Sequence, residues 1–221
     1  MRRHYRSSSR AFARLLPALA PIIAVGACSD SNAAERLGAP RVLAVTILGD
    51  AGDPRTPPVR EALAHWNDEM SRLGRQVRFD SGTVRNDSVP DDILRDASNA
   101  VLVGGPEVNA LIAKLSSEPG DIVVALSHTD LISFSVPWRN GRKGVVGLRR
   151  SDIPPLSLPN TVRNVAAHEL GHVLGLPHNS DSTTLMCGRP AACRPAAFAS
   201  TTPRFFPLTP SDERVIRSRW P

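Results

Sequence analysis

Three histidines and a glutamate lie within eleven consecutive residues of the sequence. His168 and His172 are four residues apart, so on an α-helix both imidazoles would project from one face, close enough to bind a single metal ion. Glu169 would lie at the edge of that face, where a carboxylate can take a proton from water. Zn²⁺ suits these ligands because it binds neutral imidazole nitrogen and needs only three protein ligands in a catalytic site. The spacing therefore predicts a zinc site with a general base beside it.

The third histidine, His178, requires the helix to end before it. Gly175 can adopt a left-handed conformation that ends a helix sharply. Pro177 favours an extended backbone at Leu176, so the chain would leave the turn straight. We therefore expect His178 to return to the ion as its third ligand.

The run from His168 to His178 reads H-E-x-x-H-x-x-G-x-x-H, and residues 184–188 read T-L-M-C-G. These two stretches resemble the metzincin clan of zinc endopeptidases, whose signature is this eleven-residue motif followed by a Met-turn. The short distance to the turn at Met186, and the sequence N-V-A-A-H-E-L-G-H that begins at Asn164, are similar to the matrixin branch of the clan.

The resemblance extends over residues 41–220, although only residues 162–188 carry specific motifs. A shorter likeness to archaemetzincins, at residues 129–131 and 146–148, lacks the extra cysteines typical of that group. The resemblance implies an α+β fold of the zincin type. Such a fold has a twisted mixed sheet, a long helix in the N-terminal half, a zinc-binding active-site helix and a C-terminal helix.

The resemblance also implies hydrolysis of a protein or peptide substrate. His168, His172 and His178 would hold one catalytic Zn²⁺, and Glu169 would act as the general base. Met186 would lie below the metal as apolar support. The edge strand above the cleft would pair with extended substrate, as peptides do when they add a strand to a sheet. Residues 121–127 and residues 144–148 are both candidates for that edge.

Other interpretations stay open. A surface helix can carry two solvated histidines by chance. A zinc-dependent amidase acting on cell-wall or other non-protein material could use the same site. A surface lipoprotein could retain zinc for stability alone, although the intact Glu169 argues against this because a structural zinc site needs no base.

The N-terminus resembles a bacterial lipoprotein leader. Five arginines and no acidic residue accompany an apolar run at residues 15–27, which is short for a membrane span. The run ends in V-G-A-C, which is similar to a lipobox and implies lipid modification of Cys28. We therefore expect a signal peptide at residues 1–27, a tether at residues 28–40 and one catalytic domain at residues 41–221. The protein would be exported and lipid-anchored in the bacterial cell envelope; plain secretory cleavage would instead give a secreted soluble protein.

The positive charge of the chain is concentrated in this leader. The sequence has 27 basic and 21 acidic residues, a net charge of +6. Removing the five leader arginines leaves 22 basic residues against 21 acidic ones, a net charge of +1. Nucleic-acid binding needs a retained basic face, so we expect none, and we expect a monomer whose only contact with a membrane is the lipid.

Two cysteines remain besides Cys28. Cys187 and Cys193 are separated by five residues in an export context that permits disulfides, so we expect a disulfide between them. Two free thiols, or a thiolate that caps the zinc, are the alternatives.

Calcium binding has weaker support than zinc binding. Asp50 and Asp53 follow the first predicted strand, and some matrixin loops bind Ca²⁺ there. Two carboxylates are too few ligands for Ca²⁺, so a solvated turn is the favoured interpretation. A second zinc site at His128 lacks surrounding ligands, which favours a surface histidine.

Hydrophobic periodicity places the remaining elements. Strands are predicted at residues 41–48, 76–84, 100–103, 121–127, 133–138 and 143–149. Helices are predicted at residues 57–73, 90–96, 107–115 and 210–220, besides the zinc-binding helix. Asn160 or Thr161 would cap the zinc-binding helix, and Thr209 would cap the last helix.

Overall fold

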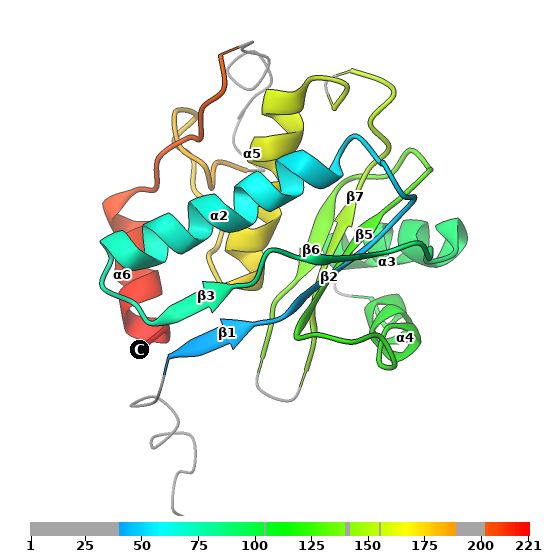
Figure 1. Ribbon diagram of the computed structural model, residues 1–221, viewed down its shortest axis with the longest axis horizontal. Coiled ribbons are helices and arrows are strands. Elements are labelled where there is room, and N and C mark those ends of the chain that lie inside the picture. Colours follow the sequence, from blue (N-terminus) through cyan, green and yellow to red (C-terminus); the bar gives the residue numbers. More distant parts are fainter. Residues whose placement is uncertain (1–39, 104, 140–141, 155, 189–201) are drawn as a thin grey trace, which may run out of the picture.

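A computed structural model describes residues 40–103, 105–139, 142–154, 156–188 and 202–221. Its main sheet has five strands: β2 (Val45–Leu48), β4 (Thr83–Arg85), β5 (Ile122–Leu126), β6 (Phe134–Val136) and β7 (Gly144–Leu148). Their order is β4-β2-β5-β7-β6, and only β6 runs antiparallel to its neighbour. A second, two-stranded sheet joins β1 (Arg41–Leu43) to β3 (Val77–Phe79) (Figure 1).

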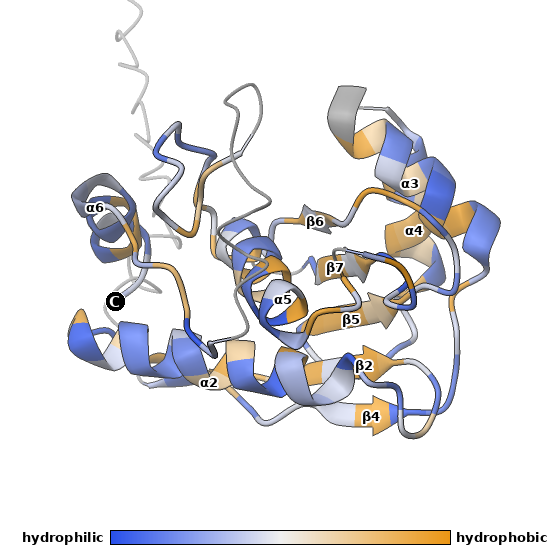
Figure 2. Ribbon diagram, turned by 90° about the horizontal axis from the view of Figure 1, so that it is seen from above, coloured by the Kyte–Doolittle hydropathy of each residue, from blue (hydrophilic) through white to orange (hydrophobic). Residues whose placement is uncertain are grey.

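Five described helices cover this framework: α2 (Thr56–Arg72), α3 (Asp91–Val103), α4 (Glu107–Lys114), α5 (Pro159–Val173) and α6 (Pro210–Arg219). Helices α2 and α5 lie on one side of the main sheet, and α3 and α4 lie on the other (Figure 2). The mixed sheet, the long helix in the first half, the helix of the histidine motif and the final helix confirm the expected α+β architecture.

The main sheet separates two hydrophobic cores, because successive side chains along a strand point to opposite faces of the sheet. In β5, Ile122 and Val124 face the core formed with α2 and α5, whereas Val123 and Ala125 face the core formed with α3 and α4. All five residues of β5 are buried. The near-continuous apolar sequence of this strand is thus typical of a central strand covered on both faces.

Helix α2 forms a buried stripe against α5. Val59, Leu63, Trp66 and Met70 recur at helical spacing and are at most 1% exposed. The Trp66 Nε1 group donates a 2.8 Å hydrogen bond to the Ala167 carbonyl of α5. This bond places the long helix directly behind the histidine motif.

Several expectations about individual elements were wrong. The predicted strand at residues 100–103 belongs to α3, because the buried spacing of Leu94, Ala97 and Ala100 continues a helix against β6 and α4. The predicted strand at residues 41–48 is divided at Ala44. The Ala44 amide donates a hydrogen bond to the Asp121 carboxylate, and the Ala44 carbonyl accepts one from the Asp121 amide. Strand β1 lies before this point and pairs with β3 outside the main sheet.

Two more differences concern strand 76–84 and the helix caps. The predicted strand divides into β3 and β4, because the Asp80 carboxylate accepts from the Val45 and Gly82 amides between them. Helix α5 begins at Pro159 without a side-chain cap, so neither Asn160 nor Thr161 caps it. The prediction for Thr209 is confirmed, since it forms a capping box with Asp212.

The predicted leader and tether fall on residues 1–40, of which only residue 40 lies in the described part of the chain. Cys28 and Cys193 also lie outside the described residues. Within the described residues, no helix has the length and apolar character needed to span a membrane.

Candidate active site

The three histidines of the motif meet at one point. His168 Nε2 lies 3.1 Å from His172 Nε2 and 3.3 Å from His178 Nε2. A tetrahedral zinc ion with Zn–N bonds of about 2.0–2.1 Å places its ligand nitrogens about 3.3 Å apart. The spacing of the three nitrogens therefore fits one zinc ion, and the described residues contain no other group of three potential ligands at such short range.

Backbone carbonyls orient two of these rings. His168 Nδ1 lies 2.7 Å from the Leu185 carbonyl, and His172 Nδ1 lies 2.7 Å from the Leu176 carbonyl. A neutral imidazole must carry its proton on Nδ1 to donate these bonds, which leaves the Nε2 lone pair for a metal. The chain after the helix thus sets the tautomers of the two histidines on the helix.

The return of His178 depends on two glycines. Helix α5 ends at Val173, and Gly175 has a φ of 96°, a conformation that L side chains rarely adopt. The His178 ring then packs directly on Gly188, where a Cβ atom would overlap the imidazole. The first glycine turns the chain, and the second makes room for the ring.

Met186 lies fully buried behind the histidine motif. A Cβ atom on Gly171 would lie 2.5 Å from the Met186 sulfur, so the helix and the methionine turn approach as closely as a glycine permits. The adjacent Leu185 carbonyl is the one that accepts from His168. The turn therefore contributes both apolar packing and a hydrogen-bond acceptor.

Glu169 is held at the sheet edge. Ser135 Oγ, from β6, donates a 2.9 Å hydrogen bond to Glu169 Oε2, and both side chains are buried or nearly so. Among the strands that the structure describes, β6 is the outermost strand of the sheet on this side. The two strands considered for this edge, at residues 121–127 and 144–148, are interior strands β5 and β7, so that expectation was wrong.

A cavity of about 630 Å³ lies between β6, α3 and α5. The three histidines and Glu169 line it, together with Ser98, Val101, Ile132 and Pro137 among others. Ile132 is 47% exposed, which is unusual for a large apolar side chain in this structure. The cavity offers an open cleft, a metal site, a carboxylate and a strand edge in one place.

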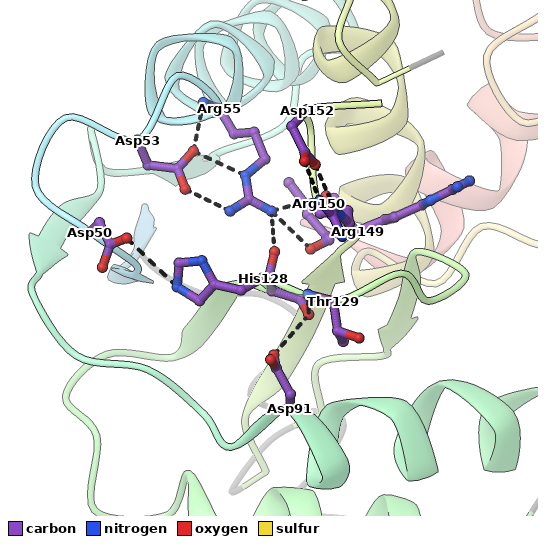
Figure 3. Close-up of polar contacts among 11 residues, drawn as sticks. Asp50, Asp53, Arg55, Asp91, His128, Thr129, Arg149, Arg150 and Asp152 are labelled. Carbon is purple, nitrogen blue, oxygen red and sulfur yellow. Dashed lines mark hydrogen bonds and ion pairs between the residues drawn. The ribbon is translucent and has the colours of Figure 1, made fainter. Parts of the chain in front are cut away.

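Asp53 has a structural role that the predicted solvated turn does not describe. Both of its carboxylate oxygens accept hydrogen bonds from the Arg55 guanidinium (Figure 3). Both side chains are almost fully buried. A guanidinium in this place occupies the oxygens that a calcium ion would need. Asp50 is exposed and lies 3.7 Å from the exposed His128, as expected for surface residues.

Cys187 is buried and disulfide-bonded. Its predicted partner, Cys193, lies outside the described residues, so the pairing of these two cysteines stays a prediction.

The sequence model of the matrixin family matches residues 61–200. The chain belongs to the matrixin family. As a matrixin it is a zinc metalloprotease, and its three converging histidines supply the site for one catalytic zinc ion. A comparison with curated proteins gives no match.

Solved structures similar to this matrixin are distant in sequence. Archaemetzincin from Methanopyrus kandleri is 18% identical, with a TM-score of 0.47, over 80% of this chain and 93% of that one. Metalloproteinase-II from Bacteroides fragilis is 10% identical, with a TM-score of 0.48, over 82% of this chain and 54% of that one. A zinc-dependent peptidase from Methanocorpusculum labreanum is 14% identical, with a TM-score of 0.42, over 78% of this chain and 99% of that one.

Three features of this matrixin site were missed by sequence reasoning. Ser135 belongs to a predicted strand. Its side chain reaches Glu169 because β6 lies at the edge of the sheet, and that strand order was not predicted. Val101 lines the cleft from the last turn of α3, where residues 100–103 were predicted as a strand. Arg219 lines it from the last helix, 41 residues beyond His178, and no local pattern marks it.

Proposed function

We propose that this matrixin is an exported endopeptidase in which Glu169 is the general base. The observation that carries the proposal is the hydrogen bond that holds Glu169 beside three histidine Nε2 atoms, within one open cleft. A structural zinc site would need neither the carboxylate nor the cleft.

Each residue of the site has a defined task in this proposal. His168, His172 and His178 would hold zinc, which lowers the pKa of a bound water toward about 7 and polarises a carbonyl. Glu169, which Ser135 positions, takes the proton of the attacking water and then delivers a proton to the leaving amine nitrogen.

Strand β6 is the element best suited to hold an extended peptide. No described strand pairs with its outer edge, and Ser133, Phe134 and Ser135 line the cleft. A peptide that adds a strand to this edge would run past Glu169 and the histidines. This arrangement supports a protein or peptide substrate more directly than a sugar-rich cell-wall substrate.

A casein hydrolysis assay tests the proposed activity. We expect the purified protein to cleave casein, a chelator to abolish cleavage and added Zn²⁺ to restore it. Glu169→Gln should lower kcat by about a hundredfold or more while the protein still binds zinc. Glu107→Gln, on α4 and outside the cleft, is the matched control and should retain activity.

Activity that survives the chelator or the Glu169 substitution would contradict the mechanism. Cleavage of cell-wall fragments without cleavage of casein would favour the amidase interpretation. Absence of both activities in a zinc-loaded, folded protein would favour a non-catalytic role.

We also propose that the protein is a monomer anchored in the bacterial cell envelope by lipid on Cys28. The leader sequence and its V-G-A-C ending support this proposal. Mass spectrometry of the membrane fraction should find a diacylated Cys28 at the mature N-terminus, and Cys28→Ala should move the protein out of that fraction. An unmodified, soluble mature chain in the wild type would contradict the anchor.

A further inference from the structure

The active-site cleft has an unbalanced charge. Among its described lining residues, Glu169 is the only carboxylate, whereas two arginines, Arg139 and Arg219, each carry a positive charge. A zinc ion on the histidines would make the cleft more positive still. A cleft with one sign of charge attracts ligands of the opposite sign.

The packing of α6 fixes the place of Arg219. Its guanidinium lies against Gly175, just after the zinc helix. A Cβ atom added to Gly175 would lie 2.7 Å from three atoms of the Arg219 guanidinium. Its Nη2 lies 3.4 Å from the Trp138 carbonyl, the residue before Arg139. The next residue, Trp220, donates a 3.0 Å hydrogen bond to the Leu174 carbonyl. Both arginines are therefore placed near the end of β6.

Neither arginine forms an ion pair with a carboxylate of the described residues. Arg217, two residues earlier on the same helix, lies 4.0 Å from Glu213, and Arg72 contacts the same glutamate at 2.6 Å. Arg139 and Arg219 are exposed and have no such partner within the described chain. Their positive charge is thus available to a ligand in the cleft.

Strand direction relates these arginines to the substrate. Strand β6 runs from Phe134 to Val136, and Arg139 follows its end. A peptide pairs most stably with a free edge in the antiparallel direction. Its amino-terminal side would then lie beside the end of β6, near Arg139 and Arg219.

We propose that Arg139 and Arg219 form an acidic-residue subsite, so that the preferred substrates carry a glutamate or aspartate on the amino-terminal side of the cleaved bond. This inference rests on the proposed endopeptidase function and deepens it by naming a substrate class. The two arginines recognise the substrate carboxylate by charge and hydrogen bonding, as guanidinium groups do.

The test uses peptides that differ at one position. Fluorogenic peptides carry Glu, Gln or Lys at each of the four positions on either side of the cleaved bond, and kcat/KM is measured with the full chain. An exposed ion pair favours its ligand about two- to fivefold, so two arginines should favour Glu over Gln about tenfold on the amino-terminal side. The preference should fall as salt is raised, because exposed charges are screened.

Charge reversal supplies the sharpest comparison. Arg139→Gln/Arg219→Gln should reduce the Glu preference to about twofold or less, and Arg219→Glu should shift it toward Lys. The preference is the ratio of kcat/KM for the Glu peptide to kcat/KM for the Gln peptide within one variant, so a general change in activity does not affect it. Arg214→Gln, on the same helix but outside the cleft, should keep the full preference.

A binding measurement separates recognition from turnover. Fluorescence anisotropy with the Glu169→Gln protein should show tighter binding of the Glu peptide than of the Gln peptide, and the arginine substitutions should remove the difference. Zinc-dependent cleavage of neutral peptides with no Glu preference would overturn the subsite and leave the endopeptidase function intact. A Glu preference only on the carboxyl-terminal side would also overturn it. No cleavage of any peptide by zinc-loaded protein would contradict the endopeptidase function, and the subsite with it.

Discussion

At the scale of single residues, hydrogen bonds from outside the motif hold the motif in position. Leu185 and Leu176 carbonyls orient His168 and His172, and Ser135 positions Glu169 from the neighbouring strand. The motif therefore supplies the reactive groups, and other segments supply their orientation. Loss of such outer partners commonly lowers metal affinity or activity about 10- to 100-fold.

Substitution of Ser135 should separate positioning from metal binding. We expect Ser135→Ala to lower kcat about tenfold, because a hydrogen bond to a charged acceptor is worth about 1.5–3 kcal/mol and Glu169 would lose its fixed orientation. KM and the zinc content should change little. Ser135→Thr keeps the hydroxyl donor and should recover most of the activity.

Ser98→Ala is the control for this prediction. Ser98 also lines the cleft, but its hydroxyl donates to the Ile132 carbonyl and not to Glu169. If Ser135→Ala and Ser98→Ala lower kcat equally, or if Ser135→Ala removes zinc, Ser135 does not act by positioning the base.

At the scale of elements, the zinc helix is placed by close packing as well as by its histidines. Gly171 lies against Met186 and Trp66. A Cβ atom added to Gly171 would lie 2.5 Å from the Met186 sulfur. Trp66 also bonds the Ala167 carbonyl. The glycine inside H-E-x-x-H thus has a packing reason that overrides its poor helix propensity.

Gly171→Ala should therefore destabilise the protein, although alanine favours helices by about 1 kcal/mol over glycine. Overpacking of a buried contact costs about 1–3 kcal/mol, so we expect a lower Tm and a displaced Met186. The measurement is thermal unfolding of the two proteins with equal zinc content.

A double-mutant cycle checks the cause of this effect. Met186→Ala opens space beside residue 171, so Gly171→Ala should cost less in that background than in the wild type. Strictly additive losses, or a stabilising Gly171→Ala, would show that the contact with Met186 is not the reason for the glycine.

Some features that depend on a few neighbouring residues were predictable, whereas those that depend on tertiary packing were not. The turn at Gly175 and the cap at Thr209 follow from the conformations of a few neighbouring residues. Residues 100–103 are apolar in a way that suits a strand or a buried helix, and only packing on β6 and α4 decides for the helix. The edge position of β6 depends on sheet order, which a single sequence does not encode locally. For the same reason, the positions of Ser135 and Arg219 in the cleft could not be predicted.

At the scale of the whole molecule, the buried pair Asp53–Arg55 joins the start of α2 to the ends of two central strands. Arg55 Nη1 donates to the carbonyls of Ser127, Leu148 and Arg149 at 2.7, 3.3 and 2.9 Å (Figure 3). Burial by itself would raise the pKa of Asp53, but the hydrogen bonds and charge of Arg55 lower it below its usual value. The pair therefore ties helix and sheet together while both groups are charged.

Asp53→Asn should destabilise the protein by about 3 kcal/mol at neutral pH, because it leaves Arg55 buried without a counter-charge. The folded-state pKa of Asp53 is depressed, so its stabilising contribution is present above its unfolded pKa of about 4. That contribution is lost as the pH falls through the lower folded value. The difference between wild type and variant in denaturant unfolding should thus shrink below about pH 4.

Asp152→Asn is the matched control. A hydrogen bond from Arg150 lowers the pKa of Asp152 to about 2, but this pair lies on the surface, where solvent screens it. We expect little change in its unfolding midpoint at neutral pH. Equal losses for the two substitutions, or a difference for Asp53→Asn that grows in acid, would contradict the role given to the buried pair.

The metal content of the purified protein tests the central claim most directly. We predict one zinc ion per chain by elemental analysis. We also predict its loss in His168→Ala, His172→Ala and His178→Ala, with the fold of each variant checked by circular dichroism. His65→Ala, at a histidine stacked on Phe205 away from the cluster, should keep the ion. A folded wild-type protein without zinc after metal reconstitution, or one that keeps zinc when any two of the three histidines are removed, would contradict the account.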